Sequence, residues 1–144
     1  MHQGNLSVLL YVRNMTKSLQ FYCDVLGGRL AWAWSIEKKR AVCEMSGSKP
    51  PPLAAVHFGG SEIQLRADPS HQPSEKPVSV VQLDVVDVDS FYRIAQRRGL
   101  KPGPPDPKHP SEPTNTPWGS RQVCIRDPDG HLLSFASQTG VRLH

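Results

Sequence analysis

The feature that most constrains the fold of this chain is an internal repeat. Leu10-x-Val12-x-Asn14 in the first half matches Leu83-x-Val85-x-Asp87 in the second, at an offset of 73 residues. Ile63-Gln64-Leu65 and Leu133-Ser134-Phe135 match at an offset of 70 residues. In both halves a strand leads into a capped helix, and a glycine-turned hairpin closes the half. Each half is therefore predicted to be strand–helix–strand–strand–strand, and because one such unit would expose a face of its sheet, two must pair around a shared surface.

The repeat also predicts the domain organisation. The 144 residues are expected to form one α+β domain made of two modules, residues 1–67 and 78–144. Residues 68–77 are polar, contain three prolines and are the best linker candidate. Two further proline-rich stretches, 46–52 and 101–117, are predicted loops, the second with at most a short edge strand.

Alternation of residue types predicts which face of each strand a side chain occupies. Residues 29–36 are typical of a strand whose large side chains share one face, namely Leu30, Trp32, Trp34 and Ile36. In residues 62–67, Ile63 and Leu65 alternate with a polar set made of Glu62, Gln64 and Arg66. In the second half, Val81, Leu83 and Val85 alternate in the same way with Val80, Gln82 and Asp84.

Charge and cysteine content narrow the class of protein. Seventeen Lys and Arg against thirteen Asp and Glu give a net charge of +4, and the basic residues are scattered, which disfavours nucleic acid and strongly cationic ligands. Cys23, Cys43 and Cys124 are odd in number and show no Cys-x-x-Cys spacing, as in a reducing cytoplasm and unlike a structural zinc site. With no leader and no long apolar run, we expect a soluble cytoplasmic protein that has no membrane partner.

Two motifs resemble those of the vicinal oxygen chelate superfamily, which includes glyoxalase, extradiol dioxygenases, fosfomycin-resistance enzymes and bleomycin-resistance proteins. The first is Leu10-Tyr11-Val12-Arg13-Asn14-Met15 continued by Ser18-Leu19-x-Phe21-Tyr22-x-x-Val25-Leu26-Gly27. The second is Pro117-Trp118-Gly119-Ser120-Arg121 followed by Asp127-Pro128-Asp129-Gly130-His131. The resemblance implies two paired βαβββ modules whose sheets curve around a cup, as in bleomycin-resistance-like proteins, usually within a homodimer.

The resemblance also locates the positions at which metal-dependent members of the family carry His or Glu ligands. In this chain they are Ser7, Gln64, Val80 and Ser134, all on the less apolar faces of their strands. Neutral hydroxyl and amide oxygens bind catalytic metals poorly, and Val80 has no donor atom. A register slip of one residue offers only Val8, Ile63, Val81 and Leu133. We therefore expect no metal and no cofactor.

The interpretation that we favour is a metal-free protein of the bleomycin-resistance type that binds and sequesters an aromatic natural product or antibiotic, neutral or anionic. Polar cup residues would be costly in a dry core, so a wet, ligand-accepting cavity explains them better. For Trp32 and Trp34, ligand stacking and plain core packing remain equal alternatives. The predicted ligand-binding residues are Ser7, Tyr11, Trp32, Trp34, Phe58, Gln64, Gln82, Trp118 and Ser134.

An enzyme remains the alternative. A metal-free lyase, isomerase or cyclase would use Glu62 or Asp84 as a base, and a raised pKa would support that role. A dioxygenase-like enzyme would need a metal recruited through Gln64 and a histidine from a loop or a second subunit. Four histidines are interpreted as ordinary surface residues, namely His57, His71, His109 and His131, and Cys124 as a small, partly buried thiol.

Overall fold

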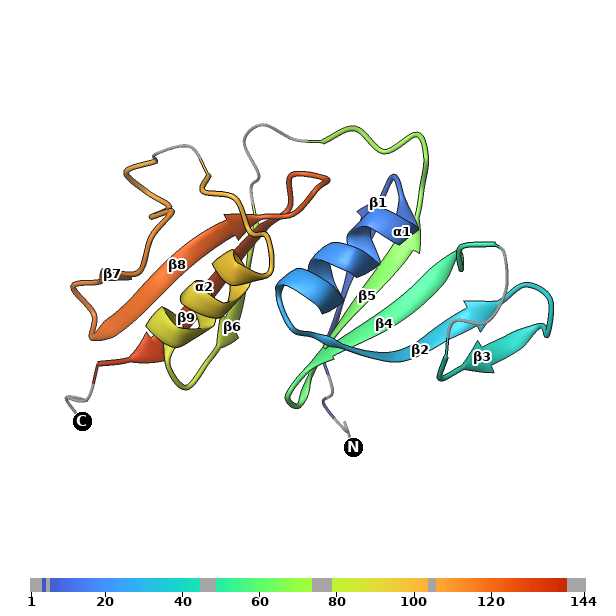
Figure 1. Cartoon of the computed structure of the whole chain (residues 1–144), viewed down its shortest axis with the longest axis horizontal. Helices are drawn as coiled ribbons and strands as arrows, with labels where there is room; N and C mark the ends of the chain where they lie inside the picture. Colours follow the sequence, from blue (N-terminus) through green and yellow to red (C-terminus); the bar gives the residue numbers. More distant parts are fainter. Residues whose placement is uncertain (1–3, 5, 45–48, 74–78, 104–105, 140–144) are drawn as a thin grey trace. The chain divides into compact units, whose positions relative to one another are not determined.

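Two compact units make up the chain, Met1–Pro73 and Ser74–His144, and each is described by itself. The computed structural model in Figure 1 describes residues 4, 6–44, 49–73, 79–103 and 106–139. Each unit is a mixed sheet with a helix across one face, so the fold is α+β with two sheets, as predicted. Residues 46–48 of the first predicted loop and residues 74–77 of the predicted linker lie outside the described residues.

The first module is a five-stranded sheet in the order β1-β5-β4-β2-β3. Its strands are β1 (Ser7–Val12), β2 (Arg29–Ser35), β3 (Arg40–Val42), β4 (Leu53–Phe58) and β5 (Ser61–Ala67). β1 runs parallel to β5, whereas the other neighbours are antiparallel. Asn14 caps the helix as predicted, because its side chain accepts from the Lys17 N–H at 3.1 Å. Helix α1 (Met15–Leu19) then widens into the π-helical segment η1 (Gln20–Val25), which the sequence did not predict.

The second module is a four-stranded sheet in the order β6-β9-β8-β7. Its elements are β6 (Val80–Asp84), α2 (Val88–Arg97), β7 (Thr114–Asn115), β8 (Ser120–Arg126) and β9 (Leu132–Gln138). Asp87 caps α2 as predicted, accepting from the N–H groups of Asp89 and Ser90 at 3.1 and 3.2 Å. The two-residue β7 is the short edge strand expected within 101–117.

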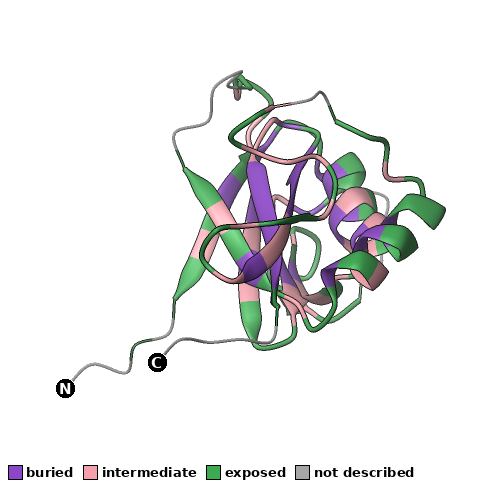
Figure 2. Cartoon of the chain, turned by 90° about the vertical axis from the view of Figure 1, so that its left-hand side faces the viewer, coloured by how far each residue is buried: buried purple, intermediate pink, exposed green. Residues whose placement is uncertain are grey.

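The core of each module lies between its helix and the apolar face of its sheet. In the first module the register pairs Leu10 with Leu65, both buried. In the second it pairs Leu83 with Phe135, whose ring stacks on Phe91 of α2 at a centroid distance of 4.3 Å. Figure 2 shows the same division, with buried residues on the strands and exposed residues on the outward side of the helices. Because strand side chains alternate, this packing leaves the polar set of each module on the other face of its sheet.

Strand β2 departs from its predicted pattern at a bulge. Leu30 pairs with Val56, whereas Trp32 pairs with the neighbouring residue Ala55. Adjacent residues of β4 point to opposite faces, so Leu30 lies on the helix side and Trp32 on the other. The prediction that Leu30 shares a face with Trp32 and Trp34 is therefore wrong, because the extra residue of the bulge reverses the alternation.

Gly28 lies at a close approach of the backbone before β2. A Cβ added there would lie 2.9 Å from the Tyr22 carbonyl oxygen, 2.8 Å from Phe58 Cζ and closer still to Val56. Gly28→Ala should therefore lower the free energy of unfolding by about 1–3 kcal/mol through overpacking, measured by urea denaturation. Gly60→Ala is the matched control, because apart from its chain neighbours no atom of the described residues lies within 4 Å of the Cβ that it would add. We expect a change below about 0.5 kcal/mol there, and equal losses in both variants would contradict the packing described.

Candidate functional site

The face of the first sheet that points away from α1, here called the open face, carries several of the residues predicted to contact a ligand. Strand register aligns its side chains in rows across the sheet. One row consists of Ser7, Glu62, His57 and Arg29, from β1, β5, β4 and β2 in turn. The row beside it consists of Leu9, Gln64, Ala55 and Trp32. All side chains of the first row, here called the polar row, are polar. The second row contains the amide of Gln64 and the indole of Trp32.

Hydrogen bonds join the polar row into a network centred on Glu62. The Ser7 hydroxyl donates to Glu62 Oε2 at 2.8 Å, and the Gln64 amide nitrogen donates to the same oxygen at 2.9 Å. His57 Nε2 lies 3.0 Å from Glu62 Oε1, and an Arg29 guanidinium nitrogen lies 3.2 Å from His57 Nδ1. The network thus links side chains from four strands.

These partners assign the tautomer of His57. A guanidinium group can only donate, so Nδ1 of His57 must accept from Arg29. The proton of the neutral imidazole then sits on Nε2 and is donated to Glu62. Sequence reasoning interpreted His57 as an ordinary surface histidine and did not single out Arg29. Only the pairing of β4 with β5 and β2 brings His57 beside Glu62 and Arg29 beside His57.

The same contacts set the charge of Glu62. Hydrogen bonds from Gln64, His57 and Ser7 lower the pKa of the Glu62 carboxyl from 4.5 to about 2. Such a carboxylate is ionised at any physiological pH and is a weak base. The enzyme alternative required a base with a raised pKa, and at Glu62 the shift runs the other way.

Aromatic side chains border the network. Trp32 is half-buried, and Trp34, two residues further along β2, is 40% exposed on the same face. Tyr11 of β1 is 42% exposed and stacks on His71 at a centroid distance of 6.5 Å. Trp32 and Gln64 lie in one row two strands apart, which is about 10 Å, and Ala55, between them, is fully buried. That span suits a planar molecule of two or three fused rings.

Two predicted aromatic contacts do not lie on the open face. Phe58 pairs with Ser61 and shares its side of β4 with Val56, so it faces the helix side near Gly28. Trp118 precedes β8 in a turn and is 74% exposed. The sequence placed both with the ligand because it assumed unbroken strands through these positions.

In the second module, the sheet face that carries Val80, Gln82 and Asp84 was predicted to present Ser134 to a ligand, and the structure differs from this prediction. Val80, Gln82 and Asp84 lie exposed on β6, but Ser134 is only 2% exposed and pairs with Cys124. Burial raises the pKa of the Cys124 thiol, against a smaller opposing effect of the Ser134 hydroxyl. Ser134 Oγ has no hydrogen-bond partner among the described residues. Ser134 therefore lies buried beside a neutral thiol rather than exposed to a ligand.

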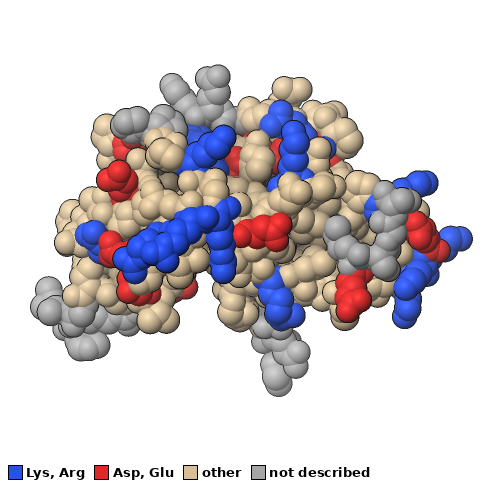
Figure 3. All heavy atoms as spheres, viewed as in Figure 1, with Lys and Arg blue, Asp and Glu red and all other residues tan. Residues whose placement is uncertain are grey.

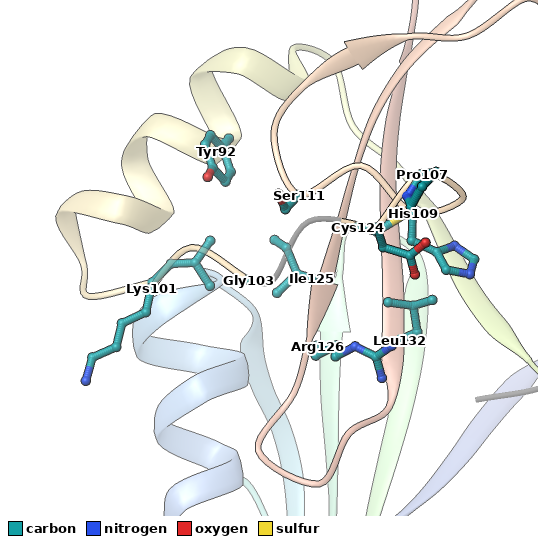
Figure 4. Close-up of a pocket in the computed structure, with 12 residues that line it drawn as sticks. Tyr92, Lys101, Gly103, Pro107, His109, Ser111, Cys124, Ile125, Arg126 and Leu132 are labelled. Carbon is teal, nitrogen blue, oxygen red and sulfur yellow. The ribbon is translucent and has the colours of Figure 1, made fainter. Parts of the chain in front are cut away.

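A cavity of about 250 Å³ lies elsewhere in the second module (Figure 4). It is lined by Tyr92 of α2, by Cys124, Ile125 and Arg126 of β8, and by loop residues that include His109. Ligand sites usually measure about 300–1,000 Å³, so this cavity is small for the molecule that the aromatic residues predict. It contains none of the predicted ligand-binding residues, and the open face is the better candidate.

Charges of both signs are mixed on the surface that Figure 3 shows, where Lys and Arg side chains lie among Asp and Glu. Arg121 and Asp89, for example, form an ion pair at 2.7 Å.

Within the described ranges, no three His, Cys, Asp or Glu residues are grouped so that they could hold a metal ion. Of the helices in that part of the chain, none has the length and apolar character needed to cross a membrane.

Comparison with known proteins identifies the family. Residues 6–135 match the family model of the Glyoxalase/Bleomycin resistance protein/Dioxygenase superfamily, and the chain belongs to this superfamily. The uncharacterized protein YraH of Bacillus subtilis (strain 168) is 27% identical over 132 residues, which cover 90% of this chain and 94% of YraH.

Two solved structures share the fold. The bleomycin resistance determinant encoded on transposon Tn5 has a TM-score of 0.67 at 20% identity, covering 94% of this chain and 98% of the other. TioX from Micromonospora sp. ML1 has a TM-score of 0.64 at 21% identity, with the same two coverages. At this level of identity the likeness establishes the fold.

The residues at the positions predicted to correspond to metal ligands do not fit a catalytic metal. Ser7 and Gln64 supply only a hydroxyl and an amide, and both donate hydrogen bonds to Glu62. Val80 has no donor atom, and Ser134 offers one buried hydroxyl. Catalytic metals take two or three imidazole, carboxylate or thiolate ligands, which this set lacks.

The lowered pKa of Glu62 predicts how stability depends on pH. A depressed carboxyl pKa stabilises the folded protein above pH 4.5, and this contribution disappears as the pH falls from 4.5 towards 2. Glu62→Gln cannot titrate, so its free energy of unfolding should fall less between about pH 6 and about pH 3, by about 1 kcal/mol after allowance for solvent screening. Urea denaturation at both pH values measures the difference. Asp24→Asn, an exposed site on η1, should keep the wild-type loss, and equal acid losses in all three proteins would contradict the network.

Proposed function

We propose that this chain is a small-molecule-binding protein that works without a metal and holds a planar, partly aromatic ligand against the open face of its first module. The observation that supports this most is the row that joins Trp32 to Gln64 beside the Glu62 network. Aromatic side chains beside a few precisely placed polar groups are the usual lining of a small-molecule site.

The comparisons support the same proposal. A bleomycin-binding protein complexed with bleomycin has a TM-score of 0.66 to this chain at 20% identity, covering 94% of this chain and 99% of the other. The Tn5 determinant is named for bleomycin resistance. Sequestration of an aromatic natural product or antibiotic is therefore the activity that we propose.

Catalysis by a base on the open face receives less support. Glu62 is held ionised by three hydrogen bonds, and a carboxylate with a pKa of about 2 accepts a substrate proton poorly at neutral pH. Asp84 lies exposed on β6, outside this network. A binding role uses the negative charge of the Glu62 carboxylate. A role as a catalytic base would require this carboxylate to accept a proton and lose its charge.

Substitution of the tryptophans tests the proposed site. A panel of planar aromatic natural products is screened by isothermal titration calorimetry and tryptophan quenching. For any binder, Trp32→Leu and Trp34→Leu should each weaken affinity about two- to tenfold, the usual contribution of an aromatic stack. Trp118→Leu is the matched control, since that residue lies in a turn and should leave affinity unchanged. Equal losses in all three variants, or a loss in Trp118→Leu alone, would place the ligand elsewhere.

Metal removal tests the remaining part of the proposal. Because the donor set does not fit a metal, dialysis against EDTA should leave ligand affinity unchanged, and elemental analysis should find far less than one metal per chain. Tightly bound stoichiometric metal, or affinity that disappears with EDTA and returns with a divalent cation, would overturn metal-free binding.

A further inference from the structure

Three hydrogen bonds of the open face are all donated to the same residue, Glu62. The Ser7 hydroxyl, one Gln64 amide hydrogen and the His57 Nε2 proton are all given to Glu62. Ser7 Oγ and Gln64 Oε1 then retain their lone pairs, and neither accepts a hydrogen bond within the described part of the chain. A ligand that reaches this end of the polar row therefore meets mainly acceptors.

The negative charge of Glu62 also favours a ligand group that donates hydrogen bonds. Glu62 is ionised, so an anionic group would be repelled here and a cationic donor attracted. The basic residues of this face lie to the sides. Arg29 is two strands away and donates to His57, and Arg66 is four residues along β5, about 13 Å from Glu62. At that distance the charge of Arg66 is largely screened at physiological salt, where the Debye length is about 8 Å. Arg29 lies closer, but its guanidinium donates to His57 on the side of the ring away from Glu62.

We infer that the ligand presents a hydrogen-bond-donating cationic group, of the amine or amidine class, to Ser7, Glu62 and Gln64, while its planar part extends across the open face towards Trp32. This inference rests on the proposed function and specifies its ligand. It differs from the expectation of a neutral or anionic ligand. That expectation came from the net charge of +4, whereas recognition depends on the groups within a few ångströms.

Three planar probes of one shape test the inference: 9-aminoacridine, a cation with N–H donors; acridine, which is neutral; and acridine-9-carboxylate, an anion. Titration calorimetry on the full chain should give a dissociation constant for 9-aminoacridine at least about tenfold below that for the carboxylate. Glu62→Gln should remove most of this preference and leave acridine affinity unchanged.

Two further variants separate local recognition from net charge and from misfolding. Asp24→Asn removes one negative charge from η1, outside the network, and should keep the wild-type preference. Gln64→Met keeps the shape and the Glu62 charge but removes the amide acceptor. It should weaken 9-aminoacridine about three- to tenfold with no effect on acridine, and it tests the site even if Glu62→Gln fails to fold.

The outcomes distinguish the inference from the function on which it rests. If acridine-9-carboxylate binds as tightly as 9-aminoacridine or more tightly, the ligand class is wrong while small-molecule binding stands. If Asp24→Asn abolishes the preference as fully as Glu62→Gln, overall charge explains it and the assignment to Glu62 fails. If none of the three probes binds at up to about 1 mM, the proposed function itself is overturned.

Discussion

The parallel pairing of β1 with β5 determines what the open face can do. Because strand side chains alternate, this register commits Leu10 and Leu65 to the helix side and brings Ser7 opposite Glu62. A slip of one residue would bury Ser7 and expose Val8, so the hydrophobic core fixes the position of the hydroxyl. The core therefore specifies the polar row as well as the fold.

The polar row shows how local chemistry can oppose overall composition. The chain is basic, yet the centre of its open face is a carboxylate that three hydrogen bonds keep ionised. Because Ser7, Gln64 and His57 donate to Glu62, the end of the row near Ser7 presents mainly hydrogen-bond acceptors. The same contacts that lower the pKa of Glu62 make it a weak base and a strong anchor for a donor. Binding and catalysis thus make opposite demands on this residue, and the geometry favours binding.

Much of the fold could be predicted from the sequence because its signals are local. Asn14 and Asp87 cap helices as expected, and alternation correctly separated Ile63 and Leu65 from Glu62 and Gln64. The failures came from irregular backbone. A bulge after Leu30 reversed the faces of β2, and β8 begins after Trp118. No single-strand pattern could reveal these features, because they depend on the partner strand.

The candidate site was harder to predict than the fold. The family resemblance pointed to Ser7 and Gln64, and alternation grouped Glu62 with Gln64, but His57 and Arg29 join them only through strand pairing. Strand alternation predicts the face of β9 on which Ser134 lies. It does not predict whether other residues cover that face, and Ser134 is buried. Sequence patterns identified the strands that carry the site, whereas the contacts between side chains required the register.

The central claim is that a ligand lies on the open face beside Trp32 and Trp34. The most direct test follows the indole N–H signals of the three tryptophans by nuclear magnetic resonance while 9-aminoacridine is added to the nitrogen-15-labelled protein. The account predicts saturable shifts for Trp32 and Trp34 and none for Trp118, which lies in an exposed turn. A saturable shift of Trp118 with Trp32 and Trp34 unmoved would contradict it.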